Sequence, residues 1–234
     1  MSPSRNTVAE DALPPSPIYP MPLVRLDLVV FRVEGAQLQV LLAKREQAPF
    51  KGRLGLPGGV LRIDLDGSLE AGAQRVARER LGTGLPQVRQ VLAVGGAKRD
   101  PRAPWAMTVV YRAVLSQELP VQPGKRVQEL VWVDAHEASQ NKKLAFDHDM
   151  LIDQAIAGLR GEVQALQFDP GFMPEEFTIP ELQARCEVVL GTPLNKVTFR
   201  RRVEEAGILQ EVPGKMVGGA HRPAKVWRLE WSLG

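Results

Sequence analysis

The sequence predicts an α+β protein in which a strand-rich domain precedes a small unit of two helices and a hairpin. Two apolar runs in residues 24–45 flank Glu34 and Gly35, which is the pattern of a β-hairpin. Residues 68–81 carry apolar side chains at helical spacing. These patterns predict a mixed sheet with a few helices in residues 23–165 and a separate helix, turn, helix, hairpin domain in residues 172–234.

Local signals mark the ends of the elements in the first domain. Ser68 is placed to cap the helix over residues 68–81, and Gly82 and Gly84 are placed to end it. Three more strands and a second helix are expected, at residues 88–94, 107–115, 128–133 and about 147–160.

The second domain follows a linker that contains Asp169-Pro170-Gly171. Thr178 and Glu181 form a capping-box pattern at the start of its first helix, and Gly191 is placed to end that helix. The apolar face expected for this helix consists of Leu182, Cys186, Val189 and Leu190.

The remainder of the second domain has the pattern of a winged helix. Asn195 is placed to cap a helix over residues 196–206, and Gly207 follows that helix. Strands are expected at residues 208–212 and 224–231, with a Gly-rich basic loop between them. The side chains of the second helix that are expected in the core are Val197, Phe199 and Val203.

The charge of the chain is concentrated near one end. The whole sequence has a formal net charge of +3. Between Asn195 and Arg228, eight Lys or Arg and three Glu give a local net charge of +5. Such a basic block indicates a surface for a polyanion, with an ordinary solvated charged face as the alternative.

Composition narrows the class of protein. The hydrophobic fraction of 44% supports a folded core, and no apolar run approaches the roughly 18 residues of a membrane span. Residues 1–22 are expected to be a disordered tail without a signal peptide. Cys186 is the single cysteine, so a reducing, cytoplasmic location and a buried structural thiol are expected.

Residues 58–82 resemble the Nudix box, G-x5-E-x7-R-E-U-x-E-E-x-G-U, where U is apolar. Counting back from Gly82 places Arg75 and Glu79 on matching positions, with a loop after Gly59 that is two residues longer than the pattern. The resemblance implies a Nudix-type α/β/α sandwich around a mixed sheet. It also implies descent from enzymes that hydrolyse diphosphates with Mg²⁺ or Mn²⁺.

The box departs from the family at its metal ligands. Val76, Arg80 and Gly67 stand where the family has glutamates, so Glu79 is a vestige of the metal site. A hard cation needs several anionic oxygens, and a guanidinium repels it. We therefore expect no catalytic residue and no metal site. Residual hydrolysis with Mg²⁺ would need substitute ligands from the lengthened loop, namely Asp64 and Asp66.

The C-terminal segments FTIPELQ, LGTPLNKVTFRRRVEEAGIL and GGAHRPAKVWRL resemble the winged helix of the Nudix-related transcriptional regulators, the NrtR family. Residues 99–102 (RDPR) and 145–148 (AFDH) resemble the Nudix portion of that family. The likeness covers residues 23 to 231. It implies a homodimeric repressor of NAD-metabolism genes that leaves a palindromic operator when ADP-ribose binds. Relatives in the wider group respond to sugars or sugar phosphates.

The resemblance and the residue chemistry together supply candidate sites. The effector, ADP-ribose or a related nucleotide, is expected to contact Lys44, Arg45, Gly58, Gly59, Glu79, Arg99 and Arg102. The second helix of the winged helix is expected to enter the major groove of double-stranded DNA, with the following loop along the backbone or minor groove. The DNA-contacting candidates are Asn195, Lys196, Thr198, Arg200, Arg201, Arg202, Lys215, His221, Arg222 and Lys225.

Three alternatives remain open at this stage. The chain could be an active hydrolase of ADP-ribose or a related dinucleotide with an accessory winged helix. It could be a regulator of the same architecture that responds to a sugar or sugar phosphate. A purely architectural nucleic-acid-binding protein is a third reading, although it leaves the large Nudix-like portion without a role.

Overall fold

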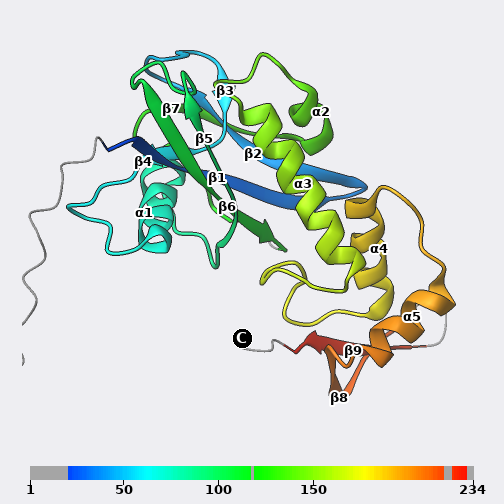
Figure 1. Ribbon diagram of the computed structural model, residues 1–234. Helices are drawn as coiled ribbons and strands as arrows, with labels where there is room; N and C mark the ends of the chain where they lie inside the picture. Colours follow the sequence, from blue (N-terminus) through cyan, green and yellow to red (C-terminus); the bar gives the residue numbers. More distant parts are fainter. Residues whose placement is uncertain (1–20, 117–118, 219–222, 231–234) are drawn as a thin grey trace, which may run out of the picture.

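A computed structural model describes residues 21–116, 119–218 and 223–230. A seven-stranded mixed sheet forms the first part of the fold (Figure 1). Its strands are β1 (Leu23–Glu34), β2 (Gln37–Arg45), β3 (Leu54–Gly55), β4 (Gly58–Val60), β5 (Arg89–Ala97), β6 (Trp105–Leu115) and β7 (Val127–Asp134). The main path runs β3-β2-β1-β6-β5, with β4 paired to β1 and β7 paired to β2. Strands β1 and β6 are parallel, and the other pairs are antiparallel.

Helices cover both faces of this sheet. Helix α1 (Leu69–Leu81) packs on one face, and α2 (Ala135–Gln140) and α3 (His148–Gln164) cover the other (Figure 1). Alternation along β1 explains the two cores: Leu26 and Leu28 join the α1 side, whereas Val29 and Phe31 join the α3 side. The expected α/β/α sandwich is therefore confirmed.

The C-terminal unit is the expected winged helix. It consists of α4 (Ile179–Leu190), α5 (Lys196–Glu205), β8 (Leu209–Val217) and β9 (Ala224–Leu229). Phe177 adds a short bridge to β9 through two backbone hydrogen bonds with Trp227.

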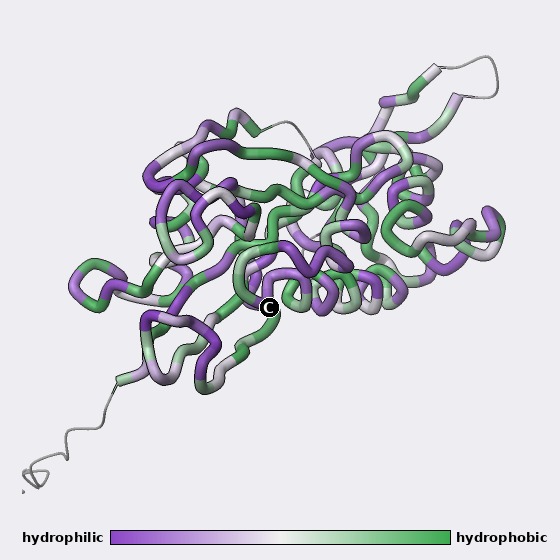
Figure 2. The backbone as a smooth tube through the Cα atoms, turned by 90° about the horizontal axis from the view of Figure 1, so that it is seen from above, coloured by the Kyte–Doolittle hydropathy of each residue, from purple (hydrophilic) through white to green (hydrophobic). Residues whose placement is uncertain are grey.

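A continuous apolar core joins the two units. Leu182, Val189 and Phe199 belong to the same buried cluster as the α3 face of the sheet. Cys186 lies fully buried in this cluster, and burial raises the pKa of its thiol to about 12, so the expected structural role holds. The buried apolar residues come from the central strands and from the helices that pack on them, and hydrophobic segments run through the middle of the molecule in Figure 2. No helix in the described parts of the chain is long and apolar enough to cross a bilayer.

The predicted caps are confirmed. Ser68 accepts from the Ala71 amide, and Gly82 takes the left-handed conformation at φ +71°. Thr178 and Glu181 form a reciprocal capping box, and Asn195 accepts from the Thr198 amide at 3.0 Å. These signals are local, which explains why residue type alone predicts them.

Several expectations need correction. Val197 is 79% exposed, so its prediction as a core residue was wrong. Strand β8 continues to Val217 through an irregular stretch after Glu211, so residues 213–217 belong to the strand and not to the loop. The short elements β3, β4 and α2 were not expected, because they depend on pairing with or packing against distant segments. Trp231 lies outside the described residues.

Candidate functional site

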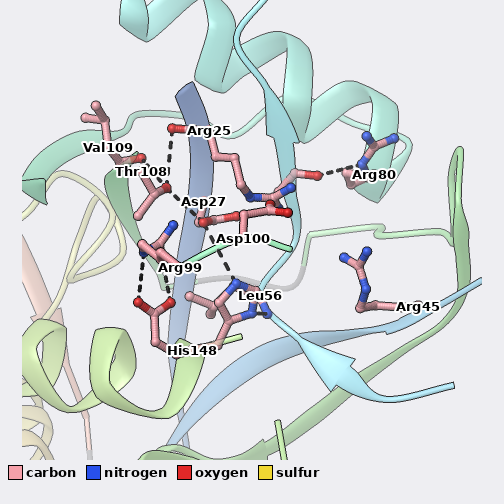
Figure 3. A network of polar contacts seen from close by, with 12 residues as sticks. Arg25, Asp27, Arg45, Leu56, Arg80, Arg99, Asp100, Thr108, Val109 and His148 are labelled. Atoms are coloured by element: carbon pink, nitrogen blue, oxygen red, sulfur yellow. Dashed lines mark hydrogen bonds and ion pairs between the residues drawn. The ribbon is translucent and has the colours of Figure 1, made fainter. Parts of the chain in front are cut away.

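An arginine-lined pocket opens beside β1, β2 and β4, at the N-terminal side of α3 (Figure 3). The guanidinium-bearing residues that line it are Arg25, Arg45, Arg80, Arg102 and Arg126. Gly58 and Gly59 supply backbone to the same wall. A Cβ on Gly58 would lie 1.9 Å from Asp27 Oδ1, so only glycine fits there. The arginine side chains fill the pocket and leave a free volume of about 60 Å³.

The arginines are crowded, and Arg45 and Arg102 have different anchors. Arg45 donates to the Pro49 carbonyl at 2.8 Å, and Arg102 forms an ion pair with Asp100 at 2.5 Å. Burial, followed by repulsion from Arg25 and Arg102, lowers the pKa of Arg45 to about 10. Since like charges meet here in partly buried surroundings, a bound anion would relieve the repulsion.

Behind the pocket lies a buried polar network. Asp27 Oδ1 accepts from Arg25 at 3.0 Å, and Asp27 Oδ2 accepts from the Thr108 hydroxyl at 2.8 Å (Figure 3). Burial alone would raise the pKa of Asp27, but Arg25 and His148 outweigh it and lower that pKa to about 2. His148 Nδ1 accepts from the Leu56 amide at 2.8 Å, and burial lowers the pKa of the imidazole to about 4. This network fixes the pocket wall to the first turn of α3.

Arg80 occupies the pocket side of the Nudix-box helix. Its Nε donates to the Gly58 carbonyl and its Nη1 to the Lys125 carbonyl, both at 2.8 Å. Its residue is 8% exposed, and burial lowers the pKa of the guanidinium. A fixed positive charge therefore stands where the box has a metal-binding glutamate.

Three acidic groups of the box, Asp64, Asp66 and Glu79, are paired with arginines. Asp66 accepts two hydrogen bonds from Arg75, at 2.7 and 2.8 Å, and Asp64 forms an ion pair with Arg62 at 2.5 Å. Glu79 lies 3.2 Å from Arg75. Within the described ranges, no group of three or more His, Cys, Asp or Glu is arranged to hold a metal ion.

The sequence-derived effector residues separate into two sets. Arg45, Gly58, Gly59 and Arg102 line the pocket. The other three do not line it: Lys44 faces Glu129 at 3.8 Å, Glu79 faces Arg75, and Arg99 forms an ion pair with Asp147 at 2.7 Å with its side chain 6% exposed.

Three pocket arginines were not among the candidates. Arg25 stands in an apolar strand run, and only its spacing of two from Asp27 signals a shared polar face. From the sequence, Arg80 indicates only that a metal ion would be repelled, and nothing local marks it as a pocket residue. Arg126 comes from a distant loop and carries no local signal.

The second candidate site is the exposed surface of α5 and the hairpin β8–β9. Lys196, Thr198, Arg200 and Arg201 are exposed on α5. Arg200 and Arg201 face Glu204 and Glu205 one turn later, at 2.8 and 3.8 Å.

Other basic candidates of the winged helix are held by nearby groups. Arg202 donates to the Gln164 carbonyl at the end of α3, at 2.8 Å, so it faces the sheet domain. On the hairpin, Lys215 forms an ion pair with Glu176, and Lys225 forms one with Glu211 at 2.8 Å. His221 and Arg222 lie outside the described residues.

Comparison with protein families agrees with both parts of the fold. The NUDIX domain model matches residues 22–155, and the NrtR DNA-binding winged helix domain model matches residues 171–229. An "ADPR responsive transcriptional repressor NtrR" from Acinetobacter baylyi is 38% identical over 210 residues, which is 90% of this chain and 83% of that protein. The chain belongs to the NrtR family.

Solved structures of the family resemble the chain over most of its length. Shewanella oneidensis NrtR in complex with a 27mer DNA matches with a TM-score of 0.74 and 37% identity, covering 88% of this chain and 93% of that one. The NUDIX domain of the same protein, crystallised with ADP ribose, matches with a TM-score of 0.54 and 36% identity, covering 58% of this chain and 88% of that one. An ADP-ribose pyrophosphatase from Methanocaldococcus jannaschii is 31% identical over 136 residues, covering 58% of this chain and 73% of the enzyme.

Proposed function

We propose that this chain is a transcriptional repressor that binds double-stranded DNA through its winged helix and releases it when ADP-ribose occupies the arginine pocket. We infer that its targets are NAD-metabolism genes, as the resemblance to the family implies. The Acinetobacter relative and the two Shewanella structures support the assignment of DNA and ADP-ribose as the two ligands. A cytoplasmic, nucleoid-associated location without membrane contact fits this role.

The observation that carries the proposal is the position of Arg80. Its guanidinium lies between two backbone carbonyls at the place of a metal-binding carboxylate, and four more arginines surround the same pocket. A diphosphate can be held there by guanidinium groups without a metal. We infer that effector binding needs no Mg²⁺ and that the box does not catalyse hydrolysis. Because the free volume is small, the arginine side chains must move apart to admit a nucleotide.

In this proposal the protein binds DNA as a dimer. One recognition helix covers a short half-site, and two-fold pairing of two copies of the chain matches a palindromic operator. Within each copy, α5 presents Arg200 and Arg201 away from the core, where Arg can make bidentate contacts with guanine.

Helix α3 supplies a direct mechanical connection between the two sites. Its first residue, His148, contacts the pocket wall at Leu56. At its other end, Gln164 accepts from Arg202 of α5, and Arg160 donates to the Val189 carbonyl of α4 at 2.9 Å. A ligand that shifts the pocket wall can therefore change how the winged helix is held, provided that it prefers one arrangement over the other.

A paired assay tests the proposal. Specific binding to a duplex is measured by gel shift, with and without ADP-ribose, and hydrolysis of ADP-ribose with Mg²⁺ is measured on the same preparation. A repressor that ADP-ribose releases from DNA should bind a specific duplex, lose that binding when ADP-ribose is added, and leave ADP-ribose unhydrolysed. Turnover at about 1 s⁻¹ or faster, typical of enzymes, would contradict the non-catalytic assignment.

Two other candidates remain as outcomes of this assay. The pyrophosphatase from Methanocaldococcus jannaschii favours an active hydrolase, which would turn over substrate irrespective of DNA. A regulator of the same architecture that responds to a sugar or sugar phosphate would stay bound with ADP-ribose and leave the DNA when a pentose phosphate is added to a parallel gel shift.

A further inference from the structure

Val197 is the apolar exception on the surface of α5. Its residue is 79% exposed, whereas every other exposed residue of this helix is polar or charged. Single exposed apolar residues are common on proteins, so exposure alone indicates no role. The position of Val197 on the helix is what distinguishes it.

Helical geometry places Val197 on the face that points away from the core. Phe199 and Val203 are the buried residues of α5 and define its inner face. At 3.6 residues per turn, Val197 and Arg201 project from the opposite side. They are also four residues apart, so their side chains are neighbours on that outer face. Arg201 lies toward Glu205, on the C-terminal side, which leaves Val197 without a covering side chain from its own turn.

The outer face at the start of α5 is where base recognition occurs in this architecture. Residues near the N-terminus of a recognition helix contact base edges in the major groove, and Val197 is the second residue of α5. The apolar group that base pairs expose in the major groove is the C5-methyl of thymine, and guanine exposes two acceptors that suit Arg. A valine beside an arginine therefore matches a thymine beside a guanine.

We propose that Val197 contacts the C5-methyl group of an operator thymine next to a guanine that is bound by Arg201, and so determines the preference for thymine at that position. The inference rests on the proposed DNA-binding function and specifies the partner chemistry of its recognition helix. It assigns to Val197 a role in specificity and none in holding the fold.

A cycle of substitutions in protein and DNA tests this contact. A specific duplex is first selected from random sequences with the full-length protein. Each thymine of one half-site is then replaced in turn by uracil, which removes only the methyl group. At one thymine next to a guanine, we expect wild-type affinity to fall about four-fold, the value of one buried methyl group. The Val197→Ala variant should bind the thymine and uracil duplexes with equal affinity.

The matched control is Val217→Ala on the hairpin. It makes the same chemical change at an apolar residue that is 52% exposed, and it should keep the full uracil penalty. If wild type is indifferent to uracil at every thymine, or if Val197→Ala keeps the penalty, the proposal is overturned. If no specific duplex is selected at all, the proposed DNA-binding function itself is contradicted.

Discussion

Arg112 of β6 and Asp169 of the interdomain segment form a buried ion pair, with Nε 2.6 Å from Oδ2 and side-chain exposures of 0% and 2%. Arg112 also pairs with Glu162 of α3. The segment continues over β6 at Gly171, where a Cβ would lie 2.4 Å from the Val114 carbonyl oxygen. The path between the two units is therefore held against the sheet.

Replacement of Arg112 by Ala should destabilise the protein by about 3–5 kcal/mol, because Asp169 would stay buried and lose its fully buried charge partner, with the half-exposed Arg89 left opposite it. Denaturation in urea measures the change in the free energy of unfolding. The control is Arg89→Ala, since Arg89 contacts the same Asp169 at 3.1 Å but has a side chain that is 44% exposed. That substitution should lower the free energy of unfolding by no more than about 1 kcal/mol. Equal losses in the two variants would show that burial of Arg112 is not the determining factor.

Substitutions of the adjacent residues Lys44 and Arg45 should have different effects on the affinity for the effector. Arg45→Ala should weaken ADP-ribose binding about ten-fold or more, because Arg45 lines the pocket and can form a charge-assisted contact with a diphosphate. Lys44→Ala should leave the affinity within about two-fold, since Lys44 faces Glu129. Calorimetry in EDTA and in Mg²⁺ measures both variants, and similar affinities in the two buffers are expected. A requirement for Mg²⁺ would contradict the role assigned to Arg80.

Substitutions in the winged helix should separate base-specific DNA binding from binding that is independent of sequence. Arg201→Ala should weaken binding to the selected duplex by about 1–3 kcal/mol and relax base preference at one position. Lys215→Ala should weaken all duplexes alike and reduce the salt dependence. Because Lys215 pairs with Glu176 in the free protein, Glu176→Gln should strengthen binding to random DNA. Salt titrations of these variants on specific and random duplexes measure each effect. An unchanged salt slope in Lys215→Ala would place the hairpin away from the phosphates.

Stability should also depend on pH through His148. Its folded pKa of about 4 lies below the ordinary value of 6.5, so the unfolded chain binds more protons between these values. The contribution of His148 to the free energy of unfolding is therefore full above pH about 6.5. It is lost as the pH falls toward 4, which lowers the free energy of unfolding by on the order of 3 kcal/mol. Asp27, with a pKa of about 2, should lose its contribution only below its ordinary value of 3.8.

Thermal unfolding between pH 4 and 7 checks this prediction. His148→Asn, whose amide oxygen can still accept from the Leu56 amide, should flatten the loss between pH 6.5 and 4. The matched substitution is His136→Asn, at an exposed residue, which should keep the wild-type slope. If both variants keep the slope, a group other than His148 is responsible.

The caps and the β1–β2 hairpin could be predicted from the sequence because each depends on a few neighbouring residues. The pocket could be predicted only in part. Arg45 ends β2 and Arg102 lies in the loop after β5, which is a local signal, but Arg126 approaches them only after the chain has folded. Val197 was misassigned because its apolar residue type was taken as a sign of burial, whereas at 3.6 residues per turn it lies opposite Phe199 and Val203, the residues that α5 buries.

Coupling between the two sites should depend on Arg202, because its hydrogen bond to Gln164 joins α5 to the end of α3. Arg202→Ala should bind ADP-ribose with wild-type affinity, since Arg202 does not line the pocket. In wild type, a coupling of roughly 1–3 kcal/mol would lower operator affinity about 5- to 150-fold when ADP-ribose binds. In Arg202→Ala the factor by which ADP-ribose lowers operator affinity should be several-fold smaller. This expectation holds even if the variant binds DNA alone with a changed affinity.

Arg201→Ala serves as the control for that experiment, because Arg201 faces Glu205 and not α3. It should weaken operator binding with and without ADP-ribose by the same factor, so the coupling factor stays at its wild-type value. Reciprocity gives an independent measurement: operator DNA must weaken ADP-ribose binding by the factor that ADP-ribose imposes on DNA binding. Both titrations should show the same reduced factor in Arg202→Ala. A full wild-type factor in that variant would show that the signal reaches the winged helix by a route other than the junction of α3 and α5.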